Sequence, residues 1–223
     1  VMSAAYRQLS TVGEHNAQAR RIDPDNKLLW RQRLRRLDSE IVRDTILSAS
    51  GKLDPAMGGP AMTLMLMPDG RFVIKEKGLP TPTSKWRRSI YVLARRNYHL
   101  SMLGVFDQPT VSAHCAMRQP SAVVLQSLTM LNDDFVIEQA AFAANRVLEK
   151  DAAITDSEAI ERAFRFILCR PPTEKESAWC VELIEKHADD AKAAGAADAD
   201  ARLKALERLC HMLLNTSEFL YVQ

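Results

Sequence analysis

The sequence predicts a mainly α-helical fold: a helical bundle with a small β-hairpin-like insertion. Three observations predict it. Gly is scarce, at 8 of 223 residues, the second half is rich in Ala, Leu and Glu, and apolar side chains recur at helical spacing. A chain of this length can bury a sizeable core. We expect one mostly helical domain over residues 1–223, a fragment of a larger protein, because the chain opens on the apolar, helix-like VMSAAYRQLS.

The first long helix is predicted between Pro24 and Gly51, after a helix end in residues 1–10. Asp23 or Asp25 can cap its first turn, and Pro24 is tolerated there. Gly51 supplies the stop. Its apolar stripe consists of Trp30, Leu34, Leu37, Ile41, Ile46 and Leu47.

The β-like insertion is predicted at about residues 60–95. The runs AMTLMLM and RFVIKE flank the turn PDG at 68–70, which is a hairpin pattern. The later run SIYVLA is β-branched and aromatic enough to form a strand, and helix is the competing interpretation.

The second half is predicted to be helical throughout, with start and stop signals between the helices. Asn132/Asp133 starts one helix, and Pro171-Pro172 ends another. The sequence T-x-x-E from Thr173 to Glu176 is a capping box, and Gly195 is a C-cap. The apolar stripes lie within 124–131, 136–148, 160–168, 180–191 and 203–213.

The net charge of +2 is unevenly distributed. Residues 1–110 hold 18 Lys/Arg against 10 Asp/Glu, and residues 111–223 hold 12 against 18. We therefore expect a basic lobe, 1–110, and an acidic helical bundle, 111–223. The asymmetry fits an anion-binding face, or two parts that dock on each other.

Several classes of partner do not fit the composition. The pI of 8.4 and the lack of an aromatic stacking pattern beside the arginines argue against a nucleic-acid partner. No run approaches the roughly 18 apolar residues of a membrane span, so no span is predicted in this segment.

The four cysteines form no CxxC or CxxCH motif, which argues against a zinc ribbon, a thioredoxin-type centre or covalent haem. Cys169, Cys180 and Cys210 lie on helical apolar stripes, where a thiol behaves as a small hydrophobe. We expect buried free thiols, and one disulfide between neighbouring helices remains an alternative if the protein is exported.

One stretch, FDQPTVSAHCAMRQPSAVVLQSLTMLND at 106–133, sets polar groups between two apolar blocks. A Cys115–His nucleophile is disfavoured because adjacent residues of an extended loop, such as His114 and Cys115, point apart. The spacing also matches no metal-ligand template. We assign no catalytic residue, no metal and no cofactor. The candidate polar cluster is Arg88, Arg96, His99, Asp107, His114, Cys115, Arg118, Gln126 and Asn132.

We interpret this cluster as a polar clasp that satisfies the backbone of a long irregular connection. Arg118 and Gln126 would tie the connection to the arginine-rich region before it and to Asp107, and Ser121 would cap the helix that follows. Arg118→Ala should then chiefly lower thermal stability.

Several stretches, in order, resemble a planctomycete-specific domain of unknown function. They are DPDNKLLWRQRLRRLDSEIVRDTILSASGKLD, GGP, RRSIYVLARRN, FDQP, CAMRQPSAVVLQSLTMLND, RPPTEKE and LLNTSEFLYV, which together cover nearly the whole chain. In the family pattern R-x-x-S-x-x-x-x-Q-A-L-x-L-L-N, Arg118, Ser121, Gln126 and Asn132 fit, and Ser127 stands where Ala is usual. The resemblance implies a position C-terminal to cytochrome-c-like modules in large exported proteins, and therefore an exported or cell-envelope location. It implies no known reaction.

We therefore expect a non-catalytic interaction or scaffold domain whose partners are upstream domains of the same parent protein. The alternatives are a module that binds an anionic polysaccharide through its arginine-rich half, and part of an enzyme acting on polysaccharides whose site is shared with an absent upstream domain.

Overall fold

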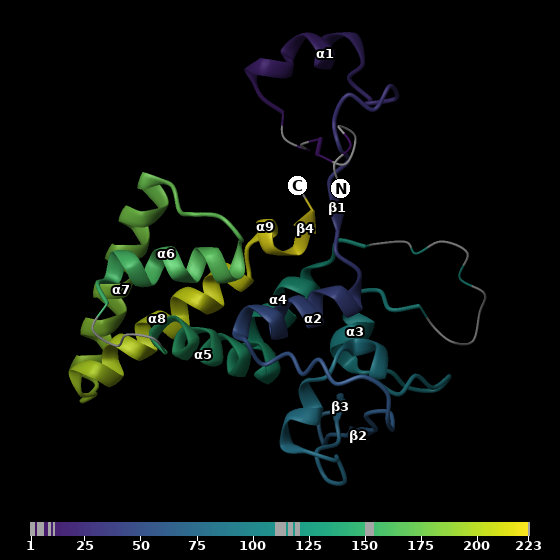
Figure 1. Cartoon of the computed structure of the whole chain (residues 1–223), viewed down its shortest axis with the longest axis vertical. Helices are drawn as coiled ribbons and strands as arrows, with labels where there is room; N and C mark the ends of the chain where they lie inside the picture. Colours follow the sequence, from purple (N-terminus) through teal and green to yellow (C-terminus); the bar gives the residue numbers. More distant parts are fainter. Residues whose placement is uncertain are drawn as a thin grey trace.

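The computed structural model describes residues 3, 7–8, 10, 12–109, 115, 118, 121–149 and 154–222. The fold is mainly α-helical, as the sequence predicts (Figure 1). The helices are α1 (Ala17–Ile22), α2 (Ser39–Ser50), α3 (Ser101–Val105), α4 (Val124–Asn132), α5 (Asp134–Leu148), α6 (Asp156–Ile167), α7 (Glu174–Ala193), α8 (Asp198–Leu214) and α9 (Ser217–Leu220). The strands are β1 (Arg35–Arg36), β2 (Leu64–Leu66), β3 (Phe72–Ile74) and β4 (Tyr221–Val222), and the 3-10 turns are η1 (Glu14–Asn16), η2 (Pro82–Trp86) and η3 (Ser89–Tyr91).

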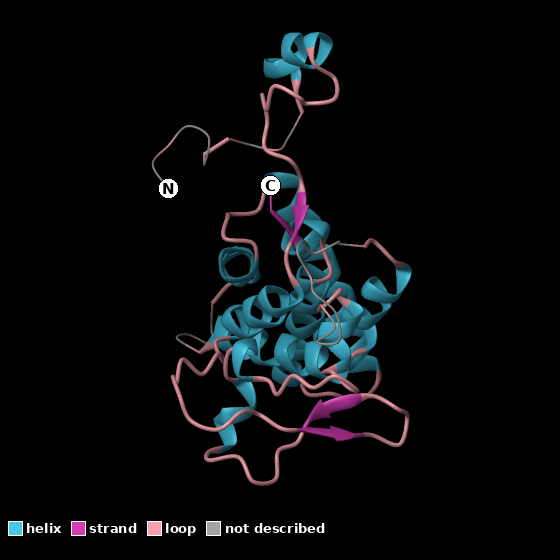
Figure 2. Ribbon diagram, turned by 90° about the vertical axis from the view of Figure 1, so that its right-hand side faces the viewer, coloured by secondary structure: helices cyan, strands magenta, loops and turns pink. Residues whose placement is uncertain are grey.

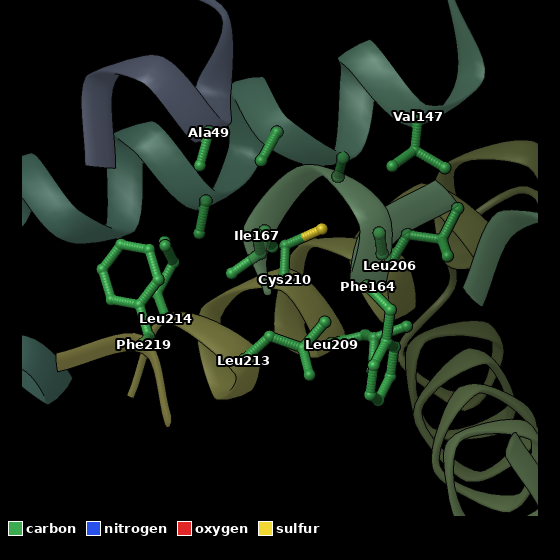
Figure 3. Packing of buried hydrophobic residues seen from close by; sticks show 14 of the residues in the cluster. Ala49, Val147, Phe164, Ile167, Leu206, Leu209, Cys210, Leu213, Leu214 and Phe219 are labelled. Atoms are coloured by element: carbon green, nitrogen blue, oxygen red, sulfur yellow. The ribbon is translucent and has the colours of Figure 1, made fainter. Parts of the chain in front are cut away.

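The core lies between α2, α5, α6, α7 and α8, and α8 contacts both α5 and α7. Figure 3 shows α8 residues Leu206, Leu209, Cys210 and Leu213 pointing into a cluster shared with Phe164 and with other helices. The predicted stripe of the last helix is thus largely the buried one. Because α2 belongs to the basic half and packs on α5 and α6, the two halves of the chain share this core.

The helix predicted between Pro24 and Gly51 begins at Ser39 instead, with Asp38 at its N-cap. Asp23 caps no long helix, because its carboxylate accepts from the backbone N–H groups of Lys27 and Leu28 (3.0 and 2.7 Å) and closes a local turn. Asn26 and Leu29 have φ of 55°, which is incompatible with a right-handed helix. The predicted stop at Gly51 is confirmed: its φ is 75° and its N–H donates to Leu47 and Ser48 carbonyls.

The predicted hairpin is present as β2 and β3, which pair antiparallel around the turn at Pro68–Gly70 (Figure 2). The later run SIYVLA is neither a strand nor an α-helix. It forms the turn η3 and then a single bridge between Val92 and Met62. The turn is held because the Asp44 carboxylate accepts from both the N–H and the hydroxyl of Ser89, each at 2.7 Å.

The predicted start and stop signals of the second half mark real helix boundaries. The capping box forms at α7, where Thr173 Oγ1 accepts from the Glu176 N–H (3.3 Å) and Glu176 accepts from the Thr173 N–H (2.7 Å). Gly195 has φ of 91° just past the end of α7. The predicted helix end at residues 1–10 falls largely outside the described residues.

Helix α4 differs from its prediction in orientation. The sequence predicts that Val124, Leu125, Leu128 and Leu131 pack inward, but they are 47–75% exposed. The residues that α4 buries are Gln126 and Met130. We call these four exposed side chains the α4 face.

A second partly unpacked region lies at the start of the chain. Figure 1 shows α1 and the loop after it set apart from the helical body. Trp30 folds back to donate to the Asp23 carbonyl (2.7 Å), yet Ile22, Leu28 and Leu29 are exposed. Along the described ranges, no helix is both long and apolar enough to cross a bilayer.

Candidate functional site

The polar segment is organised around Asp107, which follows α3 and Phe106. Its φ of 62° turns the chain sharply, and Asp tolerates that conformation better than most residues. The carboxylate accepts from Arg36 Nη2 (2.8 Å), from the N–H of Ser121 (2.7 Å) and from the Ser121 hydroxyl (2.8 Å). A more distant contact comes from Gln126 Nε2 (3.4 Å). Asp107 therefore joins β1, the 106–121 connection and α4.

Arg36 is the cation of this arrangement, and its side chain is only 4% exposed. Nη2 also donates to the Phe106 carbonyl (3.0 Å), and the guanidinium lies 5.5 Å from the centre of the Phe106 ring. Its Nε and Nη1 are buried without a hydrogen-bond partner in the described part of the chain. Because a buried guanidinium needs a counter-charge, Arg36 depends on Asp107.

Gln126 is the member that α4 contributes. Its amide donates to the Val105 carbonyl (3.1 Å) at the end of α3, and to the Ser121 hydroxyl (3.2 Å). These bonds fix the buried side of α4 against α3. The sequence predicts that Ser121 caps α4, and this prediction is wrong. Its hydroxyl donates to Asp107 instead, and the helix starts only at Val124.

Arg118 has a different partner from the one the sequence suggests. Its guanidinium makes a two-pronged contact with Glu40 at the start of α2 (2.5 and 3.0 Å), and not with Asp107. The Ser39 hydroxyl also donates to Glu40 (2.9 Å). Burial acts to raise the pKa of Glu40, but the hydrogen bonds from Arg118 and Ser39 outweigh it and hold the pKa below its usual range.

The electrostatics of Asp107 are similar. Burial acts to raise its pKa, and the bonds from Ser121 and Arg36 lower it below the ordinary value. The carboxylate therefore stays ionised and its acceptor sites are occupied by the chain itself. A group in this state is suited to bracing the fold, whereas a general base needs a free site toward a substrate.

The contacts recorded for the other candidates are with groups other than Asp107. Arg88 is exposed and 3.9 Å from Asp44, and Arg96 is exposed. Asn132 donates to the Leu128 carbonyl one turn back (3.0 Å). His99 is half-buried, and its Nδ1 has no hydrogen-bond partner in the described part of the chain.

Cys115 is exposed, and His114 lies outside the described residues. The prediction that the two side chains point apart therefore stays a prediction. All four cysteines are free thiols. Burial raises the pKa of Cys180 to about 11 and that of Cys210 to about 12. Cys169, predicted on a buried stripe, is exposed, because it follows α6 with φ of 57° and leaves the helical spacing. Among the described residues, no group of three or more His, Cys, Asp or Glu is placed to hold a metal ion.

Sequence reasoning missed Arg36 and Glu40 as members of the site. Both belong to the stretch predicted as one continuous helix. Because α2 begins only at Ser39, Arg36 instead lies in β1 and Glu40 in the first turn of α2, and from there they bind Asp107 and Arg118.

Among known proteins, the family described as "PSD1: Protein of unknown function (DUF1553)" matches residues 1–184. No curated protein and no solved structure matches the chain.

Proposed function

Given that the chain belongs to the PSD1 family of proteins of unknown function (DUF1553), we propose that it is a non-catalytic interaction or scaffold domain. Its partner in this proposal is another domain of the same parent protein. The observation that carries the proposal is the orientation of α4, whose apolar face points outward.

The α4 face supports this role energetically. Fully burying a Leu or Val side chain contributes about 1.5–3 kcal/mol, and the four residues of this face leave much of that unused. Because the helix is anchored from its other side by Gln126 and Met130, the apolar residues are presented on a fixed support. Exposed apolar patches on a soluble domain mark interaction sites.

The polar segment supports the non-catalytic part of the proposal. Asp107, Arg36, Ser121 and Gln126 bind one another, and Arg118 binds Glu40. These groups hold β1, α2, α3 and α4 together. The acceptor sites of the two carboxylates, Asp107 and Glu40, are occupied by groups of the chain itself.

The cellular context of the proposal comes from the resemblance described above. On that ground we propose that the parent is a large exported planctomycete protein that also carries cytochrome-c-like modules and is located at the cell envelope. A module for anionic polysaccharides is the alternative, and exposed arginines such as Arg33, Arg88, Arg95 and Arg96 would carry it. An enzyme whose site is completed by an upstream domain is the third candidate.

The test compares hydrogen exchange in this chain alone and in the full-length parent protein. We expect the amides of α4 to exchange more slowly in the parent, because a docked domain would cover the helix. Unchanged exchange of α4 in the parent would contradict the proposal.

A variant pair sharpens the test. Leu125→Gln combined with Leu128→Gln should leave the melting temperature of the isolated chain within a few degrees, and should abolish the added protection in the parent. Ile90→Gln, which changes an exposed apolar residue on η3, is the matched control and should leave that protection intact.

A further inference from the structure

A cavity of about 440 Å³ lies between the β2–β3 hairpin, η2 and the first turn of α5. Figure 2 shows the hairpin at the lower edge of the helical body. None of the bracing residues Asp107, Arg36, Ser121, Gln126, Arg118 and Glu40 lines it, so it is separate from the bracing described above. A volume of this size accommodates a small organic molecule. We call it the hairpin pocket.

Three aromatic side chains line the hairpin pocket: Phe72 from β3, Trp86 from η2 and Phe135 from α5. Two of the rings are held in place from behind. Phe72 stacks on Tyr98 with ring centres 4.8 Å apart, and Trp86 meets Phe142 edge-on at 5.3 Å. Cations of the protein already lie over two of these rings: Lys85 Nζ is 4.9 Å from the ring centre of Trp86, and the Arg43 guanidinium is 5.4 Å from that of Phe135. Fixed aromatic faces of this kind attract cations through their negative quadrupole.

Four carboxylates and three cations line the hairpin pocket, and three of the carboxylates come from the N-cap and first turns of α5. Asp133, Asp134 and Glu138 stand there, and Glu76 of the hairpin adds a fourth. Burial raises the pKa of Asp133, and the carboxylate caps α5 by accepting from the Phe135 N–H (2.9 Å). Asp134 and Glu138, four residues apart, remain on one face of the helix.

Two of the three cations of the lining, Arg71 and Lys85, form ion pairs with carboxylates inside and outside the lining. Arg71 lies 2.7 Å from the Asp69 carboxylate and 3.3 Å from that of Asp134. Lys85 lies 2.9 Å from the Glu76 carboxylate and 3.6 Å from that of Glu138.

The third cation, Arg43, is fully buried. Its guanidinium donates to the Arg87 and Lys85 carbonyls (2.9 and 2.8 Å) and lies 3.8 Å from Asp44. Each cation of the lining is therefore already paired or hydrogen-bonded within the protein, and four carboxylates against three cations leave the lining with a net negative charge.

From these observations we propose that the hairpin pocket binds a small organic cation with an aromatic or cyclic apolar body. The body lies against Phe72, Trp86 and Phe135. The cationic group is directed to Glu138 and Asp134. Fixed aromatic faces combined with excess carboxylate at the rim select this class of ligand and disfavour its anionic counterparts.

The experiment uses benzyltrimethylammonium and benzoate, two probes that share a ring and differ in charge. Trp86 is one of three tryptophans, so its fluorescence is isolated in a Trp30→Phe/Trp179→Phe background. We expect benzyltrimethylammonium to change Trp86 emission with a Kd of about 1 mM, a value reasonable for a ligand of this size. Benzoate should bind at least tenfold more weakly.

Two variants test the named groups, with circular dichroism melts confirming that each folds. Glu138→Gln should weaken binding of the cation about fivefold, because it removes a carboxylate from the rim. Phe72→Leu should weaken it as well, because the apolar contact remains while the aromatic face is lost. Glu161→Gln on α6 is the matched control and should have no effect.

Three results would overturn the proposal: benzoate binding as tightly as the cation, unchanged affinity in folded Glu138→Gln, or no response of Trp86 to either probe at about ten times the expected Kd. Binding that weakens in both pocket variants and not in the control would establish it.

Discussion

At the scale of single residues, Asp107 decides how the polar segment folds. Its carboxylate neutralises Arg36, 71 positions away, and accepts from Ser121, 14 positions away, so that one side chain connects β1 with the polar segment. Arg118 and Glu40 form a second, more exposed ion pair, and Glu40 lies four residues after β1. The two contacts differ in burial, and their energies should differ accordingly.

We expect Asp107→Asn to lower the free energy of unfolding by about 2 kcal/mol, because it leaves the buried Arg36 guanidinium without a counter-charge. Asn tolerates the positive φ of this position, so the change isolates the charge. Arg118→Ala, in contrast, should cost about 0.5–1 kcal/mol, because its contact with Glu40 is partly solvated. Urea unfolding of both variants measures the difference, and a larger loss in Arg118→Ala would contradict this assignment.

Glu176 makes a prediction about pH. The hydrogen bonds from Arg170, and then the Thr173 N–H, lower the pKa of Glu176 from 4.5 to about 2. A carboxyl with a lowered folded pKa stabilises the fold above its unfolded pKa, and that stabilisation is lost as the pH falls from about 4.5 toward 2.

The stability difference between wild type and Glu176→Gln should therefore be about 1 kcal/mol at neutral pH, reduced by partial exposure, and should vanish near pH 2. Thermal melts across this pH range measure it. Glu174→Gln, at an exposed position in the same helical turn, should show little pH-dependent difference. A difference for Glu176→Gln that persists at the lowest pH would be inconsistent with the ion pair.

At the scale of elements, local capping residues decide where several helices start and end. The boxes at Thr155 and Thr173 start α6 and α7, and Gly51 ends α2. The C-terminal end of α2 is also covered from α5, because Arg146 donates to the Ser48 and Ala49 carbonyls (2.9 and 2.8 Å). This contact ties the end of one core helix to another.

Two glycine substitutions should have opposite effects. Gly51→Ala should lower the free energy of unfolding by about 1 kcal/mol, since its φ is 75° and the new Cβ would lie 3.0 Å from Arg146 Cδ. Gly104→Ala, within α3, should raise it by about 0.5–1 kcal/mol, because the position is helical and the space around it is open. Chemical unfolding of the two variants checks both signs, and destabilisation by Gly104→Ala would contradict the helical geometry.

At the scale of the whole molecule, the charge asymmetry is largely used inside the fold. Arg36, Arg43 and Arg87 of the basic half are buried, and Arg71 and Lys85 reach across to carboxylates of α5. Arg36 and Arg43 bind groups within the basic half itself, whereas the contacts of Arg71 and Lys85 with α5 join the basic half to the acidic one. Because these side chains are buried or paired, the first half exposes fewer unpaired cations than its net charge suggests.

The whole-molecule prediction follows from this use of charge. We expect the isolated chain to pass through heparin resin without retention at about 0.15 M salt, where exposed charges are screened beyond about 8 Å. Retention that falls steeply as the salt rises would instead favour the polysaccharide alternative. A strongly basic protein run on the same column verifies the resin.

The sequence by itself determined the helical character of the second half and several of its helix boundaries. Patterns such as Thr173–Glu176 and Gly195 act within one or two turns, so local chemistry is sufficient to predict them. It also determined the hairpin around Pro68–Gly70, for the same reason. Gln126 could be predicted as a buried polar group near Asp107, because both lie in one short segment.

Only the tertiary structure decided the remaining features, because they depend on residues far apart in the chain. Arg36 and Asp107 are 71 positions apart, and Arg118 and Glu40 are 78. The periodicity of α4 predicts which residues share a face, but not whether that face meets the core, since burial depends on the elements packed around the helix. The same reason explains why the stretch before Ser39 leaves the helix that its apolar spacing predicts: the local turns around Asp23 and the pairing of β1 with β4 hold it in another conformation.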